Sequence, residues 1–470
     1  MKKLSRGAYN DTKGFVRVIQ IVFEVAVMTG IYYIIWRWGY RKEASFGYLY
    51  KGKYVLMGLY ALILTVFFHN SDCTMFGRLR LSDLAIGQLV ALLLVNFITY
   101  IQLCLMANRA VTAGPMIAVW AVEAAAAVGL LLLYHAIYLK LYAPHDMLLI
   151  CGTSRGLTLK FKMNARPEKY RITEVLLPDA PFEKICSRIR AHDSVVLNEV
   201  PVQLRDDILT FCYRYRIRTY VVPELTDIML RGGDTNPLFD VPMLVVKGTG
   251  LSPTQRIVKR AMDLILCSLA MIPAAPIMLA AALAIKLEDG GPVFFRQDRL
   301  TRWGREFEIL KFRSMVVNAE QQEGPALATE DDPRITKVGK FLRATRLDEL
   351  PQLLNILRGD MSIVGPRPER KCFAEEFARE IPEFPYRLKV RGGLTGYAQI
   401  YGKYNTSAYD KLRLDLTYIE NYSLLLDIRL MILTLRVIFS RDSTEGADVA
   451  EETEEKAERL MEELKKKNRD

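Results

Sequence analysis

The chain has 470 residues, which is too long for one ordinary domain and predicts two or three structural units. Apolar residues make up 51% of it and charged residues 25%, a combination typical of membrane segments joined to a water-facing part. The formal net charge of +11 favours anionic lipids and phosphorylated substrates over nucleic acid, because no compact basic run has interleaved aromatic residues. The seven cysteines form no CxxC pair, which argues against a zinc site or a disulfide framework.

The N-terminal third carries four apolar segments, at 15–36, 55–68, 84–106 and 116–139. A helix needs about 20 apolar residues to cross a bilayer, so the third segment suffices and the second is marginal. We expect a transmembrane four-helix bundle over residues 15–140, preceded by a cytoplasmic leader at residues 1–14 that is not a removable signal.

Charged residues around and within these segments leave their topology open. The loop at 37–53 is as basic as the leader, so the distribution of positive charge does not decide the orientation. Glu123 and His135 lie inside the fourth segment. Hydrogen bonds that pack helices together are favoured as their role over a polar pathway through the membrane.

Residues 146–247 alternate short apolar strands with helices, which predicts a small parallel, Rossmann-like α/β domain. Its first turn, Gly152-Thr-Ser-Arg-Gly156, departs from the GxGxxG pattern of dinucleotide-binding domains. A scaffold or regulatory domain is therefore favoured. The alternative is a bound dinucleotide, with Glu174 as the ligand of its ribose.

A second kind of membrane segment follows a linker at 248–253. Residues 264–285 carry no charge and are long enough, at ~1.5 Å per residue, to cross a bilayer once. Basic residues flank the segment on both sides, which predicts that both ends are cytoplasmic. Pro273 and Pro276 near its middle remove backbone donors and favour a kink. These features predict a re-entrant helix, and the alternative is a fifth, kinked span.

Residues 287–441 contain no histidine, which excludes Ser-His and Cys-His catalysis and histidine-ligated zinc in this region. They concentrate Arg, Lys, Asp and Glu in short Gly- and Pro-rich stretches. Such a mixture suits phosphate chemistry, because cations neutralise phosphoryl oxygens while carboxylates hold Mg²⁺ or attack phosphorus. An amphipathic helix is predicted at 424–439, against core or lipid surface. A solvated, charged tail is predicted at 442–470.

Adjacent carboxylates in Arg-Leu-Asp348-Glu349-Leu-Pro project in different directions, so one could approach phosphorus while the other holds a metal. Lys311 and Arg313 are two residues apart and would share one side of a strand. Arg367 stands between two prolines. Taken alone, these patterns favour simpler readings: an Asp-Glu pair at a helix start complements the helix dipole, and Gly-Pro-Arg-Pro is typical of a turn.

The ordered series of motifs from residue 259 to 438 strongly resembles the bacterial sugar transferase family, the monotopic phosphoglycosyl transferases. The motifs are KRAMD, GPVFFRQDR, LKFRSM, DDPRITKVGKFLR, LDELPQLLNILRGDMSIVGPRPE, LTGYAQIYG and LDLTYIENYSLLLDI. The N-terminal half resembles the long form, which adds four membrane helices and an α/β domain. The resemblance implies a catalytic α/β domain at 256–441 that contains the re-entrant helix at 264–285.

The resemblance also assigns residue roles. Asp348 matches the catalytic aspartate and Glu349 the Mg²⁺-holding glutamate. Arg343 matches an active-site arginine, Arg367 a phosphate-contacting arginine, and Lys311 with Arg313 a basic pair that contacts substrate phosphate. Two departures stand out: Ala275-Pro276 replaces the usual Ser-Pro at the bend, and Gly392 and Tyr397 replace Pro and Trp. The second departure predicts altered acceptor or lipid contacts.

The implied reaction moves a sugar-1-phosphate from a UDP-sugar to polyprenyl (undecaprenyl) phosphate, releasing UMP, through a phosphosugar-aspartyl intermediate. It is the first membrane step of exopolysaccharide, capsule or O-antigen-type glycan assembly, at the bacterial inner membrane with the catalytic domain in the cytoplasm. The lipid bilayer is a partner, and a homodimer and contacts with glycan-assembly enzymes are expected. Two alternatives remain: direct transfer with Asp348 as a base, and a membrane scaffold that senses nucleotide through 146–247. No residue identifies the sugar.

Overall fold

The computed structural model describes residues 6–40, 51–75, 79–142, 144–238, 240–317, 332–402, 406–439 and 447–467. Two compact units emerge. The first contains the described residues up to Pro223 together with the C-terminal helix, and the second contains those from Glu224 to Ile438.

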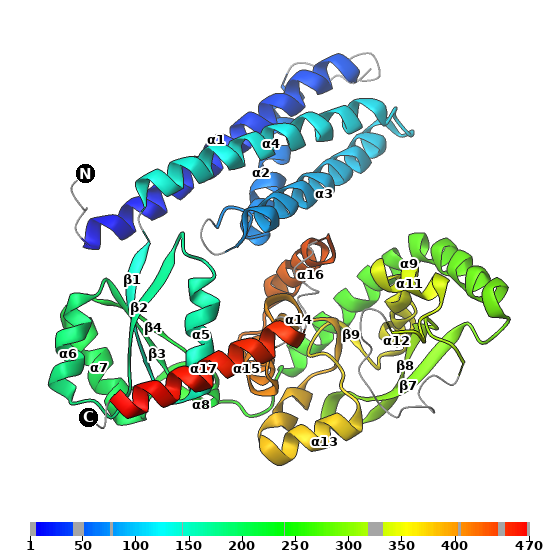
Figure 1. Ribbon diagram of the computed structural model, residues 1–470. Helices are drawn as coiled ribbons and strands as arrows, with labels where there is room; N and C mark the ends of the chain where they lie inside the picture. Colours follow the sequence, from blue (N-terminus) through cyan, green and yellow to red (C-terminus); the bar gives the residue numbers. More distant parts are fainter. Residues whose placement is uncertain are drawn as a thin grey trace. The chain divides into compact units, whose positions relative to one another are not determined.

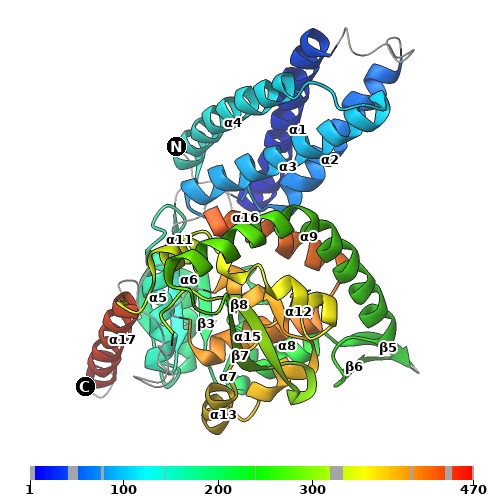
Figure 2. The same cartoon turned by 90° about the vertical axis from the view of Figure 1, so that its right-hand side faces the viewer.

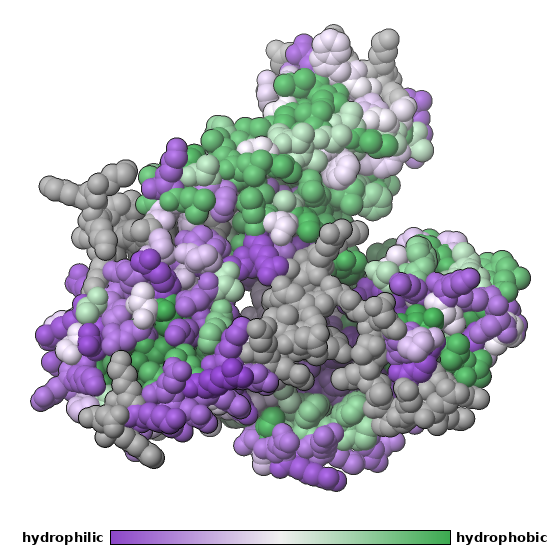
Figure 3. Space-filling view, viewed as in Figure 1, coloured by the Kyte–Doolittle hydropathy of each residue, from purple (hydrophilic) through white to green (hydrophobic). Residues whose placement is uncertain are grey.

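Four long helices open the first unit: α1 (Arg6–Gly39), α2 (Gly52–Asn70), α3 (Leu81–Ala107) and α4 (Gly114–Leu141) (Figure 1). They share one apolar core, in which Tyr32, Tyr60, Leu92 and Val119 are fully buried. Their outer faces stay apolar, and Figure 3 shows this surface in green. Each is long and apolar enough to cross a membrane, including α2, which the sequence left marginal. The helix α1 already begins within the expected leader, of which residues 1–5 lie outside the described residues.

Buried polar side chains link these helices. Glu123 of α4 accepts hydrogen bonds from the Tyr60 hydroxyl at 2.6 Å and from Asn96 Nδ2 at 2.7 Å. Glu24 of α1 accepts one from Gln88 Nε2 at 2.7 Å. These contacts join helix to helix, and thus support the packing role expected for Glu123. No such contact to a described residue is made by His135.

A four-stranded parallel sheet follows, with the order β2-β1-β3-β4. Its elements are β1 (His145–Cys151), α5 (Ser154–Asn164), β2 (Tyr170–Leu176), α6 (Phe182–Ala191), β3 (Ser194–Asn198), α7 (Val202–Arg214) and β4 (Arg218–Val221). Alternate side chains of β1 enter opposite cores, since Leu148 packs towards α6 and α7 and Leu149 towards α5. The predicted parallel α/β domain is present.

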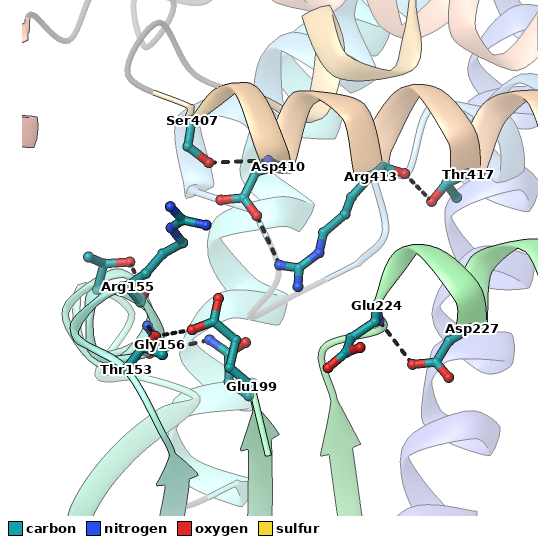
Figure 4. Close-up of polar contacts among 12 residues, drawn as sticks. Thr153, Arg155, Gly156, Glu199, Glu224, Asp227, Ser407, Asp410, Arg413 and Thr417 are labelled. Carbon is teal, nitrogen blue, oxygen red and sulfur yellow. Dashed lines mark hydrogen bonds and ion pairs between the residues drawn. The ribbon is translucent and has the colours of Figure 1, made fainter. Parts of the chain in front are cut away.

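The turn after β1 is tightly built (Figure 4). The Thr153 hydroxyl caps α5 by accepting a hydrogen bond from Gly156 N at 3.1 Å, and it also bonds the carboxylate of Glu199. Glu174 lies away from this turn, on the edge strand β2, where it is paired with Leu148 of β1. Its carboxylate instead faces Arg188 at 3.4 Å and His192 at 3.7 Å. The structure therefore does not bring Glu174 to the place where a ribose ligand was considered.

The C-terminal helix α17 (Ala447–Lys467) packs on the same face of the sheet as α5. Ala457 and Met461 are buried there against Met147 and Leu157. An apolar stripe at helical spacing explains the contact, because charged residues fill only the outer face. This segment is thus a packed helix on one side, whereas the sequence predicted a solvated tail. Residues 442–446 and 468–470 of that tail lie outside the described residues.

The second unit mixes helices with three two-stranded sheets: antiparallel β5–β6, antiparallel β7–β8 and parallel β9–β10. In chain order it contains α8 (Leu225–Arg231), β5 (Asp234–Leu238), β6 (Val241–Val245), α9 (Pro253–Asp289), β7 (Phe294–Leu300), η2 (Arg302–Gly304), β8 (Glu306–Phe312), α11 (Lys337–Ala344), η3 (Leu347–Glu349), α12 (Gln352–Arg358), β9 (Ser362–Val364), α13 (Lys371–Glu380), η4 (Phe384–Lys389), β10 (Gly393–Thr395), α14 (Tyr397–Tyr401), α15 (Ala408–Glu420) and α16 (Leu424–Phe439).

The boundary between the units differs from the expected one at residue 247. Leu225 and Ile228 of α8 are buried beside Val364 and Leu412, so the chain from Glu224 onward packs with the second unit. Side chains cap both helices of this contact, with Asp227 accepting from Glu224 N at 2.9 Å and Ser407 accepting from Asp410 N at 3.1 Å (Figure 4). Apolar periodicity shows that α8 buries a face but not which partner covers it.

The longest helix is α9, which extends beyond the predicted 264–285 at both ends. It begins at a capping box, in which Ser252 and Gln255 bond each other's backbone, and contains Pro273 and Pro276. Figure 2 shows its bent path. Cys267 and Ala274 pack against the core, whereas apolar side chains such as Ile272 and Leu279 remain exposed on the outside. With the four N-terminal helices, α9 indicates a membrane-associated protein.

The predicted amphipathic helix at 424–439 is α16, whose bounds match it. Leu430 and Leu433 are fully buried, while Leu425 on another face is 72% exposed.

Candidate active site

Asp348 and Glu349 lie in η3, a single tight turn between α11 and α12. The residue that leads into it, Arg346, has a φ of 58°, in the left-handed region that non-glycine residues seldom adopt. Such conformations cluster at functional sites, where the surrounding structure maintains them. The adjacent carboxylates are thus presented by a strained turn and do not simply begin a regular helix.

Two cations from distant segments meet at Glu349. Lys311 Nζ, at the end of β8, lies 3.0 Å from Glu349 Oε1, and Arg367 Nη2 lies 3.3 Å from the same oxygen. The Glu349 side chain is only 14% exposed. Burial alone would raise its pKa, but the charges of Lys311 and Arg367 outweigh burial and lower the pKa to about 2. Glu349 is therefore ionised at neutral pH.

Asp348 is in a different electrostatic situation. Its side chain makes no hydrogen bond to any other described residue. Burial and the neighbouring charge of Glu349 raise its pKa, while Lys311 and Arg343 partly oppose the increase. A carboxyl that is half-buried, unpaired and surrounded by cations is free to react with an incoming phosphoryl group.

Asn355 positions Lys311, although the sequence did not point to it. This residue of α12 is fully buried, and its side chain completes the open edge of β8. Asn355 Oδ1 accepts a hydrogen bond from Leu310 N at 2.9 Å, and Nδ2 donates one to Glu308 O at 2.7 Å. Asp348 and Glu349, called the dyad from here on, directly precede α12. These two bonds therefore fix the strand that carries Lys311 relative to Glu349.

Arg367 is supported by a buried ion pair that the sequence also did not reveal. Arg387 Nη2 donates to the backbone oxygen of Arg367 at 3.1 Å and lies 2.7 Å from the carboxylate of Asp415. Both side chains are almost completely buried, 4% and 1% exposed. Burial raises the pKa of Asp415 to about 6, against the lowering effect of Arg387. No local motif marks this pair, because its members are distant in sequence.

The two remaining predicted residues have different positions. Arg343, in the last turn of α11, is close enough to Asp348 to lower its pKa, but its side chain makes no hydrogen bond to a described residue. Arg313 does not reach the dyad: its buried guanidinium binds the carboxylate of Asp289 at the end of α9. The strand β8 ends at Phe312, so the alternation that would place Arg313 beside Lys311 stops one residue earlier.

The carboxylates fit a magnesium ion that arrives with a diphosphate. The described residues contain no group of three or more His, Cys, Asp or Glu side chains that would hold a metal by themselves. Magnesium is usually held by one or two carboxylates, with substrate phosphates and waters completing its shell. Asp348 and the Oε2 atom of Glu349, which makes no hydrogen bond to a described residue, are donors of this kind.

A cavity of about 140 Å³ opens beside Arg367. Its walls are mainly apolar and include Leu300, Pro366, Ala378, Phe384 and Leu388. Arg367, whose guanidinium contacts Glu349, is one of the residues that line it. The site thus combines an unpaired carboxyl, two cations held against Glu349 and an apolar recess.

This arrangement occurs within a segment, residues 254–441, that matches the model of the family described as bacterial sugar transferase. Over 192 residues the chain is 42% identical to a UDP-glucose:undecaprenyl-phosphate glucose-1-phosphate transferase of Caulobacter vibrioides, covering 39% of this chain and 71% of that protein. The chain belongs to the bacterial sugar transferase family.

Two further relatives are similar over 192 and 220 residues. A UDP-N-acetylgalactosamine-undecaprenyl-phosphate N-acetylgalactosaminephosphotransferase of Aeromonas hydrophila is 46% identical, over 40% of this chain and 45% of its own length. A UDP-glucose:undecaprenyl-phosphate glucose-1-phosphate transferase of Escherichia coli K12 is 40% identical, over 46% and 47%. The chain thus spans about half the length of these two relatives, whose names differ in the sugar.

Proposed function

We propose that this protein transfers a sugar-1-phosphate from a UDP-sugar to undecaprenyl phosphate, releasing UMP and forming a diphosphate-linked sugar. The observation that carries the proposal is the convergence of Lys311 and Arg367 on Glu349, next to the unpaired carboxyl of Asp348. The family match at residues 254–441 and the similarity to undecaprenyl-phosphate sugar transferases support it. This reaction would begin exopolysaccharide, capsule or O-antigen-type glycan assembly.

In the first step, a carboxylate oxygen of Asp348 attacks the sugar-bearing phosphorus. The bond from that phosphorus to the bridging oxygen breaks, and UMP leaves with the bridging oxygen and its electron pair. Lys311, Arg343 and Arg367 offset the negative charge on the phosphoryl oxygens. A magnesium ion held by Glu349, when bound, would supply further neutralisation of the diphosphate.

In the second step, a phosphate oxygen of undecaprenyl phosphate attacks the same phosphorus, and the bond to Asp348 breaks. The aspartate leaves as a carboxylate, so it begins and ends the cycle ionised. The uracil ring of the donor is assigned to the apolar cavity beside Arg367, because its flat face can pack on proline and aliphatic walls. Arg367 would then lie between the base and the reacting phosphate.

The membrane helices are assigned to the same task. We place α1–α4 as a four-helix transmembrane bundle in a bacterial inner membrane and α9 as a re-entrant helix bent at Pro273 and Pro276. The apolar outer face of α9 supports this placement. A shallow helix would keep the catalytic domain in the cytoplasm while the phosphate of the acceptor lies at headgroup depth.

The decisive experiment measures UMP release from a panel of UDP-sugars by the purified protein in detergent with Mg²⁺ and undecaprenyl phosphate. We expect release with at least one sugar, ping-pong kinetics, and a trapped phosphosugar adduct that the Asp348→Asn variant lacks. Sequential kinetics without an adduct would favour direct transfer, with Asp348 as a base. Full activity of Asp348→Asn would contradict both mechanisms, and no release from any UDP-sugar would favour a scaffold.

A further inference from the structure

A group of five arginines lies apart from the dyad in the second unit, and is called the arginine cluster here: Arg256, Arg260, Arg302, Arg305 and Arg391. Two come from the first turns of α9, two from the connection between β7 and β8, and one from the residue before Gly392. These segments are distant in the chain, so only the tertiary fold brings their charges together.

Backbone contacts define where the cluster lies. The Thr301 hydroxyl donates to Asp360 O at 2.8 Å and accepts from Gly392 N at 3.3 Å. This junction makes Arg302 and Arg391 neighbours. A Cβ atom at Gly359 would lie 3.3 Å from Arg260 Nη2, which places that guanidinium beside the same loop.

Carboxylates of the described residues balance only part of the positive charge of the cluster. Arg305 pairs with Asp360 at 2.8 Å, but Arg256 and Arg260 bind only backbone carbonyls. Arg302 and Arg391 make no side-chain hydrogen bond or ion pair with a described residue. Burial, together with Arg256 and Arg305, lowers the pKa of Arg302. Burial together with Arg302 and Arg260 lowers that of Arg391, and the opposing charge of Asp263 does not cancel this effect. Because arginine stays protonated in proteins, these cations repel each other until an anion binds.

Exposed apolar groups accompany the cations. Trp303, next to Arg302, is 62% exposed and has a φ of 63°, a backbone conformation that costs a bulky residue energy. Ile257, next to Arg256, is 71% exposed at the start of the apolar outer face of α9. Tryptophan beside arginine is typical of the depth at which lipid headgroups meet acyl chains.

We propose that the arginine cluster binds the phosphate of an anionic membrane phospholipid, through the guanidinium groups of Arg302 and Arg391 and with Trp303 against the lipid. Guanidinium groups bind phosphate through paired, charge-assisted hydrogen bonds. The inference rests on the proposed membrane position of α9, but not on the transfer reaction. The bound lipid would hold the first half of α9 at the membrane surface.

The experiment titrates the full-length protein in neutral detergent with dihexanoyl phosphatidylglycerol, dihexanoyl phosphatidylcholine or inorganic phosphate, and reads the melting temperature. We expect phosphatidylglycerol to raise it at concentrations where the other two do not. The Arg302→Gln/Arg391→Gln variant should need at least ten times more phosphatidylglycerol for half of this shift. The Arg302→Lys/Arg391→Lys variant should retain most of it.

The matched control is Arg296→Gln/Lys371→Gln, which removes two exposed cations elsewhere in the same unit and should respond like the wild type. An unchanged response of the glutamine variant would overturn the proposal, as would equal shifts with both lipids. If inorganic phosphate raised the melting temperature as much as phosphatidylglycerol, and the glutamine variant lost this effect, the site would bind soluble phosphate. That result would overturn the proposal of a lipid ligand. If the double variant melts early without ligand, each single glutamine variant should still weaken binding at least threefold. The melting temperature does not depend on UMP release. A failure of the lipid-binding proposal can therefore be told apart from a failure of the proposed transfer reaction.

Discussion

Lys311 Nζ and Glu349 Oε1 are 3.0 Å apart, and this contact joins the end of β8 to the strained turn that carries the dyad. The pair does more than balance charge, because Asn355 fixes the strand on one side and the left-handed Arg346 presents the turn on the other. The ionisation of Glu349 therefore depends on a cation that is 38 residues away in the sequence.

Replacing Lys311 with methionine should reduce the rate of UMP release by two to three orders of magnitude, a loss of about 3–4 kcal/mol of transition-state stabilisation. Lys311→Arg should recover part of the rate because it keeps the charge. A Lys311→Met variant that releases UMP at a rate within fivefold of the wild type would contradict this role.

Lys311→Met should also change the pH dependence of activity. With Lys311 present, the pKa of Glu349 is about 2, so its ionisation does not limit activity above pH 4. Loss of the lysine charge removes one of the two cations that lower this pKa, while burial still raises it. The acidic limb of the pH–rate profile should therefore move to higher pH in Lys311→Met. An acidic limb at the wild-type position would contradict the assignment.

The low pKa of Glu349 also predicts the direction of acid destabilisation. Its folded pKa lies below the unfolded value of about 4.3, so the stabilisation is complete above that value. It is lost as pH falls from about 4.3 towards 2. Melting curves of Glu349→Gln and the wild type should therefore converge over this range. A difference in melting temperature between Glu349→Gln and the wild type that stays constant down to pH 2 would argue against the ion pairing of Glu349 with Lys311 and Arg367.

Asn355→Ala should lower the free energy of unfolding by about 2–4 kcal/mol, since it leaves Leu310 N and Glu308 O without their buried partner. Activity should fall as well, because β8 carries Lys311. The matched control is Asn421→Ala, which removes an exposed side-chain hydrogen bond at the end of α15 and should change stability little. Equal effects of both variants in melting experiments would refute the positioning role.

Arg387→Met should destabilise the protein by about 3–5 kcal/mol, because it leaves the carboxylate of Asp415 buried without its cation. The double variant Arg387→Met/Asp415→Leu should recover much of the loss, since it removes both charges. The melting temperatures of Arg387→Met, Asp415→Leu and the double variant together measure the coupling between the two side chains. Additive losses would mean that the pair does not support the Arg367 loop.

Filling the cavity beside Arg367 with Ala378→Phe should raise the KM for the UDP-sugar about tenfold while kcat stays within threefold. The substituted residue belongs to α13, outside the turn that carries Asp348 and Glu349, and its larger side chain would fill the recess assigned to uracil. Glu376→Gln, a change on the exposed face of α13, serves as the control. An unchanged KM would contradict the assignment of the nucleobase to this cavity.

Local sequence patterns predicted the elements well where the pattern itself carries the information. Long apolar runs predicted the helices α1–α4 and α9, and alternating short strands and helices predicted the parallel sheet. The boundary at Pro223 and the packing of α17 were not foreseen, because periodicity shows that a face is buried without naming the partner. For the same reason Arg313 was grouped with Lys311, although β8 ends between them.

The adjacent carboxylates of Asp348 and Glu349 and the rigid setting of Arg367 are properties of consecutive residues, so both can be predicted from the sequence, as can the family. Only the packed fold shows which cations reach Glu349, that Asn355 and Arg387 hold them in place, and that the five arginines of the arginine cluster come together. The physical reason is that electrostatic and hydrogen-bonding effects depend on separation in space, which only the packed fold establishes.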